Sequence, residues 1–340
     1  MLKKIEVLTD YVPGPGECYE ITPGILWIRM PLPFRLNHIN LWLIEEQDGW
    51  VLVDSGINDE RTKELWERVF VEVLDGKPIT RLICTHAHPD HIGLGGWIQE
   101  KYETKLLITR EEWAFGRMFA CGNMNGGKFY RDYLLRMGFD QSQWSDYEDH
   151  IATADQLYYD VPFQFERLCD GSEIKIAEKS WKVIVGLGHS NEHACLYCPE
   201  LEVLIAGDQV LPKITPTIMV QAHEPEANPL FDFLESNKKL RDLPKSVAVL
   251  PSHNIPFTGL NERLDQYISH HMERLSVVMS VCEKPHSCAE ISKILFPQEL
   301  DLHGKFFSIG ETMAHVKYLQ YEGRLSYRID ENGVERYLKV

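Results

Sequence analysis

The segment HAHPDH at residues 86–91 constrains this chain most, because four of its six side chains are types that ligate metals. It follows the apolar run ITRLICT, which predicts a strand, and Pro89 with the periodic run IGLGGWIQ predicts a helix start. His86 and His88 would then lie on the turn leaving the strand and point at one ion, while Asp90 and His91 could point at a second. Any single histidine is more often structural, but four residues of ligand type within six positions favour a metal centre.

Three more ligand-type residues follow apolar runs that predict strands. His189 ends WKVIVGLGHS, Asp208 ends EVLIAGD and His253 ends VAVLPSH. Strand ends along one edge of a sheet lie side by side, so groups far apart in the sequence can form one cluster. The predicted cluster consists of His86, His88, Asp90, His91, His189, Asp208 and His253.

The remaining pattern divides the chain into an α/β part, residues 1–260, and a smaller part, residues 261–340. Short apolar runs with an interposed amphipathic helix fill residues 24–109, and strand-like runs return between 173 and 253. Residues 110–165 between them are rich in aromatics, Met and Gly and predict a helical insertion that forms a lid or pocket wall. After a boundary near 258–264, three helical stretches and a hairpin follow in the order of a winged helix.

Composition and charge narrow the class of protein and partner. Of 340 residues, 44% are apolar and 25% are charged, which is typical of a globular protein. A net charge of −16 disfavours nucleic acid, and in the third C-terminal helix only Lys317 is cationic against Glu311 and Glu322. No secretory signal and no apolar stretch of the roughly 20 residues that span a bilayer is evident. We therefore expect a cytoplasmic protein with a small-molecule substrate and no membrane partner, its oligomeric state open and a homodimer possible.

The eight cysteines are scattered, and a chain of this size needs no disulfide framework. We expect reduced thiols. Cys195 and Cys198 lie in HACLYC, a predicted strand, where residues three apart face opposite sides. A shared metal or redox role for this pair is therefore not expected.

Over residues 20–260 the ligand pattern resembles the metallo-β-lactamase fold superfamily, whose mark is His-x-His-x-Asp-His with a later His, Asp and His. The resemblance implies an αβ/βα sandwich with the metals at one edge of its two sheets, and a small winged-helix C-terminal domain. It puts His86, His88 and His189 on the first metal and Asp90, His91 and His253 on the second, with Asp208 bridging. Asp54 in LVDSG matches an early Asp that orients the site, although a turn-capping role would also explain it.

Comparison within the superfamily narrows the chemistry. True β-lactamases of this fold usually have Cys where this chain has Asp208 and lack His91, and flavodiiron proteins have Glu at the place of His88 plus a flavodoxin module. The complete set resembles glyoxalase-II-type thioesterases. The C-terminal part resembles the cap of the lactamase-beta-2-like branch, which includes an endoribonuclease.

The expected activity is hydrolysis of an ester or thioester by a hydroxide that bridges two divalent metal ions. Zinc is the leading choice, and iron or manganese fits the same ligands. Asp90 and Asp208 are the expected catalytic carboxylates, which offset the ionic charge, and one of them accepts the proton left after attack. Two alternatives remain open: a metal-dependent endoribonuclease or phosphodiesterase, and an oxidoreductase similar to the mononuclear-iron persulfide dioxygenases.

Residues that contact the substrate are the least constrained part of the prediction. His38, Arg117, Asn123 and Lys213 could hold a polar or carboxylate group, and a surface or structural role explains each of them as well. The aromatic insertion favours a partly apolar substrate, although core packing would need the same residues. The other histidines are expected to be structural: His150, His193, His223, His270, His271, His286, His303 and His315.

Overall fold

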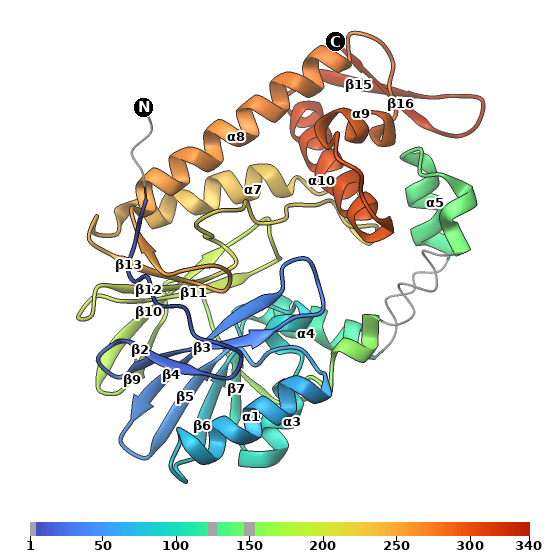
Figure 1. The fold of residues 1–340 in the computed structure, drawn as a ribbon. Coiled ribbons are helices and arrows are strands. Elements are labelled where there is room, and N and C mark those ends of the chain that lie inside the picture. The colour runs from blue at the N-terminus through green and yellow to red at the C-terminus, as the bar shows by residue number, and fades with distance from the viewer. Residues whose placement is uncertain (1–4, 122–127, 146–153) are drawn as a thin grey trace.

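The computed structural model describes residues 5–121, 128–145 and 154–340. Two seven-stranded sheets dominate it (Figure 1). The first runs in the order β2 (Cys18–Thr22), β3 (Ile25–Pro31), β4 (His38–Glu46), β5 (Gly49–Val53), β6 (Ile79–Ile83), β7 (Lys105–Ile108), β8 (Phe165–Arg167). The second runs β1 (Glu6–Val7), β14 (Phe257–Thr258), β13 (Ala248–Pro251), β12 (Val203–Gly207), β11 (His193–Cys198), β10 (Lys179–Gly186), β9 (Glu173–Ile176). Pairing is antiparallel except along β5–β6–β7–β8 and between β12 and β13.

The two-residue period of β4 shows why the sheets stack. Leu41 and Leu43 pack in a core with the outer helices, whereas Trp42 and Ile44 pack in a core between the two sheets. A strand buried on both faces reads as a continuous apolar run, as this one does in the sequence.

Helices cover both outer faces of the sandwich. On the first sheet lie α1 (Glu60–Glu72) and α3 (Gly95–Tyr102), packed through residues such as Trp66 and Ile98. On the second lie α7 (Pro229–Ser236), the 3-10 turn η3 (Asn237–Asp242) and α8 (Leu260–Val281). The expected αβ/βα arrangement is therefore confirmed.

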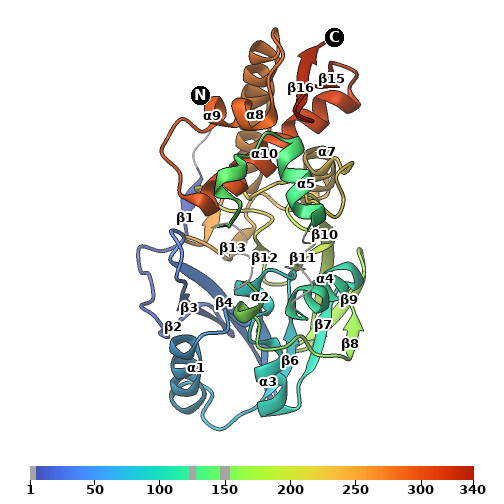
Figure 2. The ribbon, with the colours of Figure 1, turned by 90° about the vertical axis from the view of Figure 1, so that its right-hand side faces the viewer.

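The insertion expected at residues 110–165 is partly helical. It contains α4 (Arg110–Ala120), α5 (Lys128–Arg136) and the 3-10 turns η1 (Gln141–Gln143) and η2 (Ala154–Leu157), whereas residues 158–164 are irregular. Figures 1 and 2 both place α5 beside the C-terminal helices, away from the sheets. The hydroxyl groups of Tyr130 and Tyr133 bond Gln221 and the carbonyl of Val220, so α5 contacts the loop after β12.

The C-terminal part has the expected element order: α8, α9 (Cys288–Leu295), α10 (Leu302–Tyr321), then the hairpin β15 (Leu325–Ile329) and β16 (Glu335–Lys339). Its winged-helix classification stays a prediction. The third helix begins at Leu302, nine residues before the expected start at 311, because Asp301 caps it by accepting from the amide of Gly304 at 2.7 Å. Two glycines, at 304 and 310, obscure the helical pattern there.

Cys195 and Cys198 lie on opposite faces of β11, one in the core under α8 and the other between the sheets, as expected. All eight cysteines are free thiols. Over the described ranges, every helix is too short or too polar to cross a bilayer.

Candidate metal centre

The exits of four strands converge on one edge of the sandwich. After β6 the chain turns through His86 and His88 into the short helix α2 (Pro89–Ile92), which begins with proline at its first position and carries Asp90 and His91. From the other sheet, His189 follows β10, Asp208 follows β12 and His253 follows β13. All seven predicted ligand residues are therefore brought to one place, as strand-end geometry requires.

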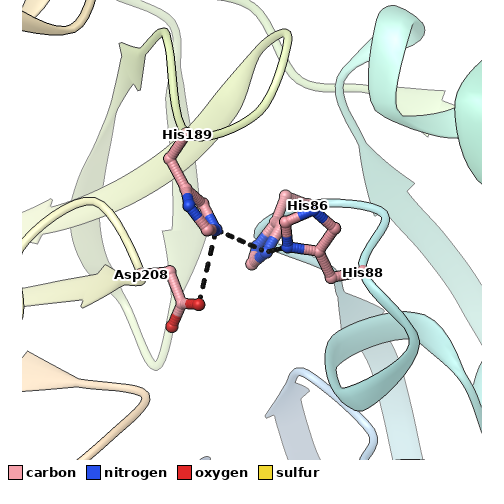
Figure 3. Close-up of side chains that lie close together, drawn as sticks. All are labelled: His86, His88, His189 and Asp208. Atoms are coloured by element: carbon pink, nitrogen blue, oxygen red, sulfur yellow. Dashed lines mark hydrogen bonds and ion pairs between the residues drawn. The ribbon is translucent and has the colours of Figure 1, made fainter. Parts of the chain in front are cut away.

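These side chains form two adjoining sets of possible ligands. In the first, one donor atom from each of His86, His88, His189 and Asp208 lies within 4.8 Å of the others. Nε2 of His86 is 2.8 Å from Nδ1 of His88 and 3.2 Å from Nε2 of His189, which is 3.4 Å from Oδ2 of Asp208. Figure 3 shows the two histidines of the β6–α2 loop facing His189 and Asp208 across this gap.

The second set consists of Asp90, His91 and His253, again within 4.8 Å. Oδ2 of Asp90 is 3.6 Å from Nε2 of His91 and 3.5 Å from Nε2 of His253. The other oxygen of Asp208, Oδ1, is 3.7 Å from His91 Nε2 and 3.3 Å from His253 Nε2. Asp208 therefore turns one oxygen toward each set, which is the place predicted for a bridging ligand.

The spacing of these atoms fits divalent cations. Ligand nitrogens and oxygens about 2.0–2.1 Å from a tetrahedral ion are about 3.3 Å apart, close to the distances seen here. Nε2 of His91 and Oδ1 of Asp208 are buried and have no hydrogen-bond partner among the described residues. Two imidazole nitrogens facing each other at 3.2 Å, as in His86 and His189, also need a proton or a cation between them. The donor set thus suits divalent metal binding.

Three of the histidines have their other ring nitrogen occupied. Nδ1 of His91 donates to Oδ2 of Asp54, that of His189 to the carbonyl of Thr217, and that of His253 to the carbonyl of His38, each at 2.8 Å. With Nδ1 bonded in this way, Nε2 is the nitrogen that faces the centre, and its lone pair is available to a metal when Nε2 carries no proton.

Asp54 does more than cap a turn. It is 1% exposed, adopts a left-handed backbone with φ of 62°, and accepts from the amide of Thr85 at 2.8 Å as well as from His91. Asp54 thus lies beside His91, a candidate ligand, and its role in orienting the site stays a prediction.

Charge is unevenly distributed across the centre. Burial lowers the pKa of both His91 and His253. For His91, the carboxylates of Asp90, Asp54 and Asp208 outweigh burial and raise the pKa well above its usual value. For His253, Asp208 and Asp90 raise the pKa to about 10. The same histidines overcome burial to hold the pKa values of Asp90 and Asp208 below the usual range. Protons on this side thus balance two carboxylate charges, a balance that cations would supply instead.

On the opposite side, burial and neighbouring imidazoles lower the pKa of His86, and burial and His189 lower that of His88 to about 3. Both are therefore neutral at physiological pH, the state in which imidazole ligates a metal.

Two buried residues beside the centre were not predicted from the sequence to belong to it. His193, expected to be only structural, is fully buried and its Nε2 accepts from the amide of Asp208 at 3.0 Å. Glu112 is also fully buried and accepts from the amides of Ala87 and Glu192. The one available signal was the position of His193, four residues after His189 and at the start of a strand.

The four candidate substrate contacts are placed differently, and their role stays a prediction. His38 is buried and its Nε2 accepts from the amide of Asn254, with burial lowering its pKa to about 3. Arg117 donates to Asp160 and to a backbone carbonyl at 2.8 and 2.6 Å. Lys213 is exposed on the loop after β12, and residue 123 lies outside the described residues.

Comparisons with known proteins agree with this geometry. Residues 35–253 match the profile of the metallo-beta-lactamase superfamily, and residues 275–340 match one described as metallo-beta-lactamase-like, C-terminal domain. The crystal structure of a beta-lactamase domain protein from Burkholderia ambifaria is 38% identical and superposes with a TM-score of 0.92, covering 99% of this chain and 98% of that one.

Two curated relatives are more distant. A probable metallo-hydrolase of Bacillus subtilis is 22% identical over 320 residues, which is 92% of this chain and 97% of its own length. A beta-lactamase-like protein 2 homolog of Caenorhabditis elegans is 27% identical over 254 residues, 75% of this chain and 68% of its own.

Proposed function

This chain belongs to the metallo-beta-lactamase superfamily, and from that premise we propose that it is a hydrolase that uses two divalent metal ions to cleave an ester or thioester. The position of Asp208 carries the proposal. One carboxylate faces His189 with one oxygen and His253 with the other, at 3.4 and 3.3 Å, so the two donor sets adjoin. Two separate mononuclear sites would not need this shared side chain.

His86, His88 and His189 would hold the first ion, Asp90, His91 and His253 the second, with Asp208 between them. When bound, such ions lower the pKa of water toward neutrality and polarise the oxygen on which charge develops. Zinc suits a donor set of this kind best, and iron or manganese is compatible with it.

The chain's own groups supply ligand geometry and proton transfer. The bonds to Nδ1 fix the tautomers of His91, His189 and His253, so their Nε2 atoms need no reorganisation before ligation. The Asp90 side chain is 16% exposed, whereas that of His91 is fully buried. Because its carboxylate lies beside His91 and His253 and is partly open to solvent, Asp90 is our choice for accepting the proton of an attacking water.

The surroundings favour an acyl substrate over a nucleic acid. The net charge is −16, and Lys317 of α10 is 9% exposed and pairs with Glu226 at 2.6 Å. An exposed apolar ring is present elsewhere: Phe34, on the loop before β4, is 38% exposed and stacks on His303 of α10. An acyl chain matches such surfaces better than a polyphosphate backbone does.

The test is a hydrolysis screen of thioesters, lactones and phosphodiesters on metal-reconstituted protein, with D208A as the inactive control. We expect about two zinc ions per chain and turnover of a thioester or lactone that D208A lacks. One iron per chain with thiol-dependent oxygen uptake would replace the proposal with a dioxygenase. Cleavage of RNA without ester turnover would replace it with a nuclease.

A further inference from the structure

A buried carboxylate links the two loops that carry the first set of donors. Glu112, in the first turn of α4, is 0% exposed. Its Oε2 accepts from the amide of Ala87 at 2.8 Å, and its Oε1 accepts from the amide of Glu192 at 2.8 Å. Ala87 lies between His86 and His88, and Glu192 lies three residues after His189.

We propose that Glu112 is a positioning residue that sets the distance between the His86–His88 turn and the His189 loop, and so determines the affinity of the first metal position. This inference rests on the proposed function, because it presumes that the centre holds metals.

The contacts around the linked amides support this role. The carbonyl of Ala87 accepts from the hydroxyl of Tyr158 at 3.1 Å, so both backbone groups of the residue between the two histidines are fixed. The side chain of Thr109 donates to the carbonyl of Glu192 at 2.8 Å, which fixes the other loop to the N-terminus of the same helix. The start of α4 therefore holds both loops, and Glu112 is the side chain that contacts each of them.

Burial raises the pKa of Glu112, whereas the hydrogen bonds from the amides of Glu192 and Ala87 favour its ionised form. Removing an ionised carboxylate from water is costly unless hydrogen bonds and nearby positive charge compensate it. Two amide donors supply part of that compensation, and bound cations one residue away from Ala87 would add to it.

Two substitutions test the hydrogen bonds of Glu112 separately from its size: E112Q keeps the volume, and E112D keeps the charge. In E112Q one oxygen becomes an NH2 group that confronts an amide N–H, so one of the two loops loses its partner without a change in volume. E112D keeps the charge but is one methylene shorter and cannot reach both amides. E111Q is the matched control, because Glu111 is its exposed neighbour on the same helix.

The experiment is a competition titration of zinc against a chromogenic chelator, which resolves the affinities of the two positions without any substrate. We expect E112Q to weaken one ion by about tenfold or more and the other by less than about threefold, and E111Q to change neither. Hydrogen exchange of peptides covering residues 84–92 and 187–195 should accelerate in metal-free E112Q and not in E111Q.

Each outcome bears on one claim. If wild-type protein binds no metal, the proposed function fails and this inference fails with it. If wild-type protein binds two ions and E112Q binds both as tightly, or loses both equally, the positioning role alone is overturned. If E112Q does not fold, E112D carries the same test, with selective loss of one ion as the supporting result.

Discussion

Replacing Asp54 with asparagine should damage one metal position through the tautomer of His91. In the wild type, Oδ2 of Asp54 accepts the proton on Nδ1 of His91 at 2.8 Å. Asparagine can still accept from the amide of Thr85, but its NH2 group then faces Nδ1 and forces the histidine proton onto Nε2, the atom that faces Asp90 and Asp208. The lone pair that would ligate the second ion is lost.

The magnitude follows from the bond that is broken. A hydrogen bond to a charged partner contributes about 1.5–3 kcal/mol, and each 1.4 kcal/mol is about a factor of ten, so we expect the second ion to bind roughly 10–100-fold more weakly. Backbone strain does not confuse the result, because asparagine tolerates the left-handed conformation that Asp54 adopts with φ of 62°.

The assay is the zinc competition titration at pH 7.5, with D75N as the control. Asp75 is exposed and also left-handed, with φ of 49°, so the same substitution is made in the same backbone conformation away from the centre. The reasoning would be refuted if D54N bound both ions with wild-type affinity, or if it weakened the ion held by the other set of donors instead.

Three further predictions concern stability. R263M should lower the free energy of unfolding by about 2–4 kcal/mol in urea titrations, because the buried guanidinium donates to two carbonyls of the loop after β12; R241M, which removes an exposed ion pair, should cost less than about 1 kcal/mol. G207A should cost about 3 kcal/mol, because a Cβ there would lie 2.4 Å from the His193 ring and φ is 52°; wild-type stability would contradict the close approach. Burial raises the pKa of Glu311 from 4.5 to about 7, so the unfolded chain loses that proton first and the folded state loses stability as pH rises from about 4.5 to 7. E311Q should therefore be about 3 kcal/mol more stable than wild type at pH 8 and equal to it at pH 4, and equal stability at both would refute the shift.

The sequence was sufficient to select the candidate ligands that meet at this edge, because each one carries a local signal. A run such as EVLIAGD combines an apolar strand, a glycine that allows a bend and an acidic residue, so Asp208 could be assigned without knowing its neighbours in space. His86 and His88 likewise directly follow an apolar run, ITRLICT. Candidate ligands that directly follow an apolar strand pattern could thus be predicted from the sequence.

The side chains that hold the ligands in place carry no such signal. Glu112 lies in the first turn of an amphipathic helix, where an acidic residue is ordinary, and only the folded chain shows that it faces two backbone amides. His193 is likewise a lone histidine at the start of a strand. The partner in each case is a backbone N–H, which every non-proline residue offers, so no residue type marks it.

Contact between the two sheets explains why these groups meet at all. The amide of Ala194 in the second sheet donates to the carbonyl of Thr85, next to His86, at 2.8 Å, and the amide of Asn40 in the first donates to the carbonyl of Ser252, next to His253, at 2.7 Å. The side chain of Asn40 also donates to the carbonyl of Pro251 and to that of Asn254, which directly follows His253. Each sheet thereby fixes the backbone beside a ligand of the other. A strand-end rule predicts which residues reach an edge. The distance between the two edges depends on these cross-sheet hydrogen bonds, and that distance sets how far apart the candidate ligands of the two sheets lie.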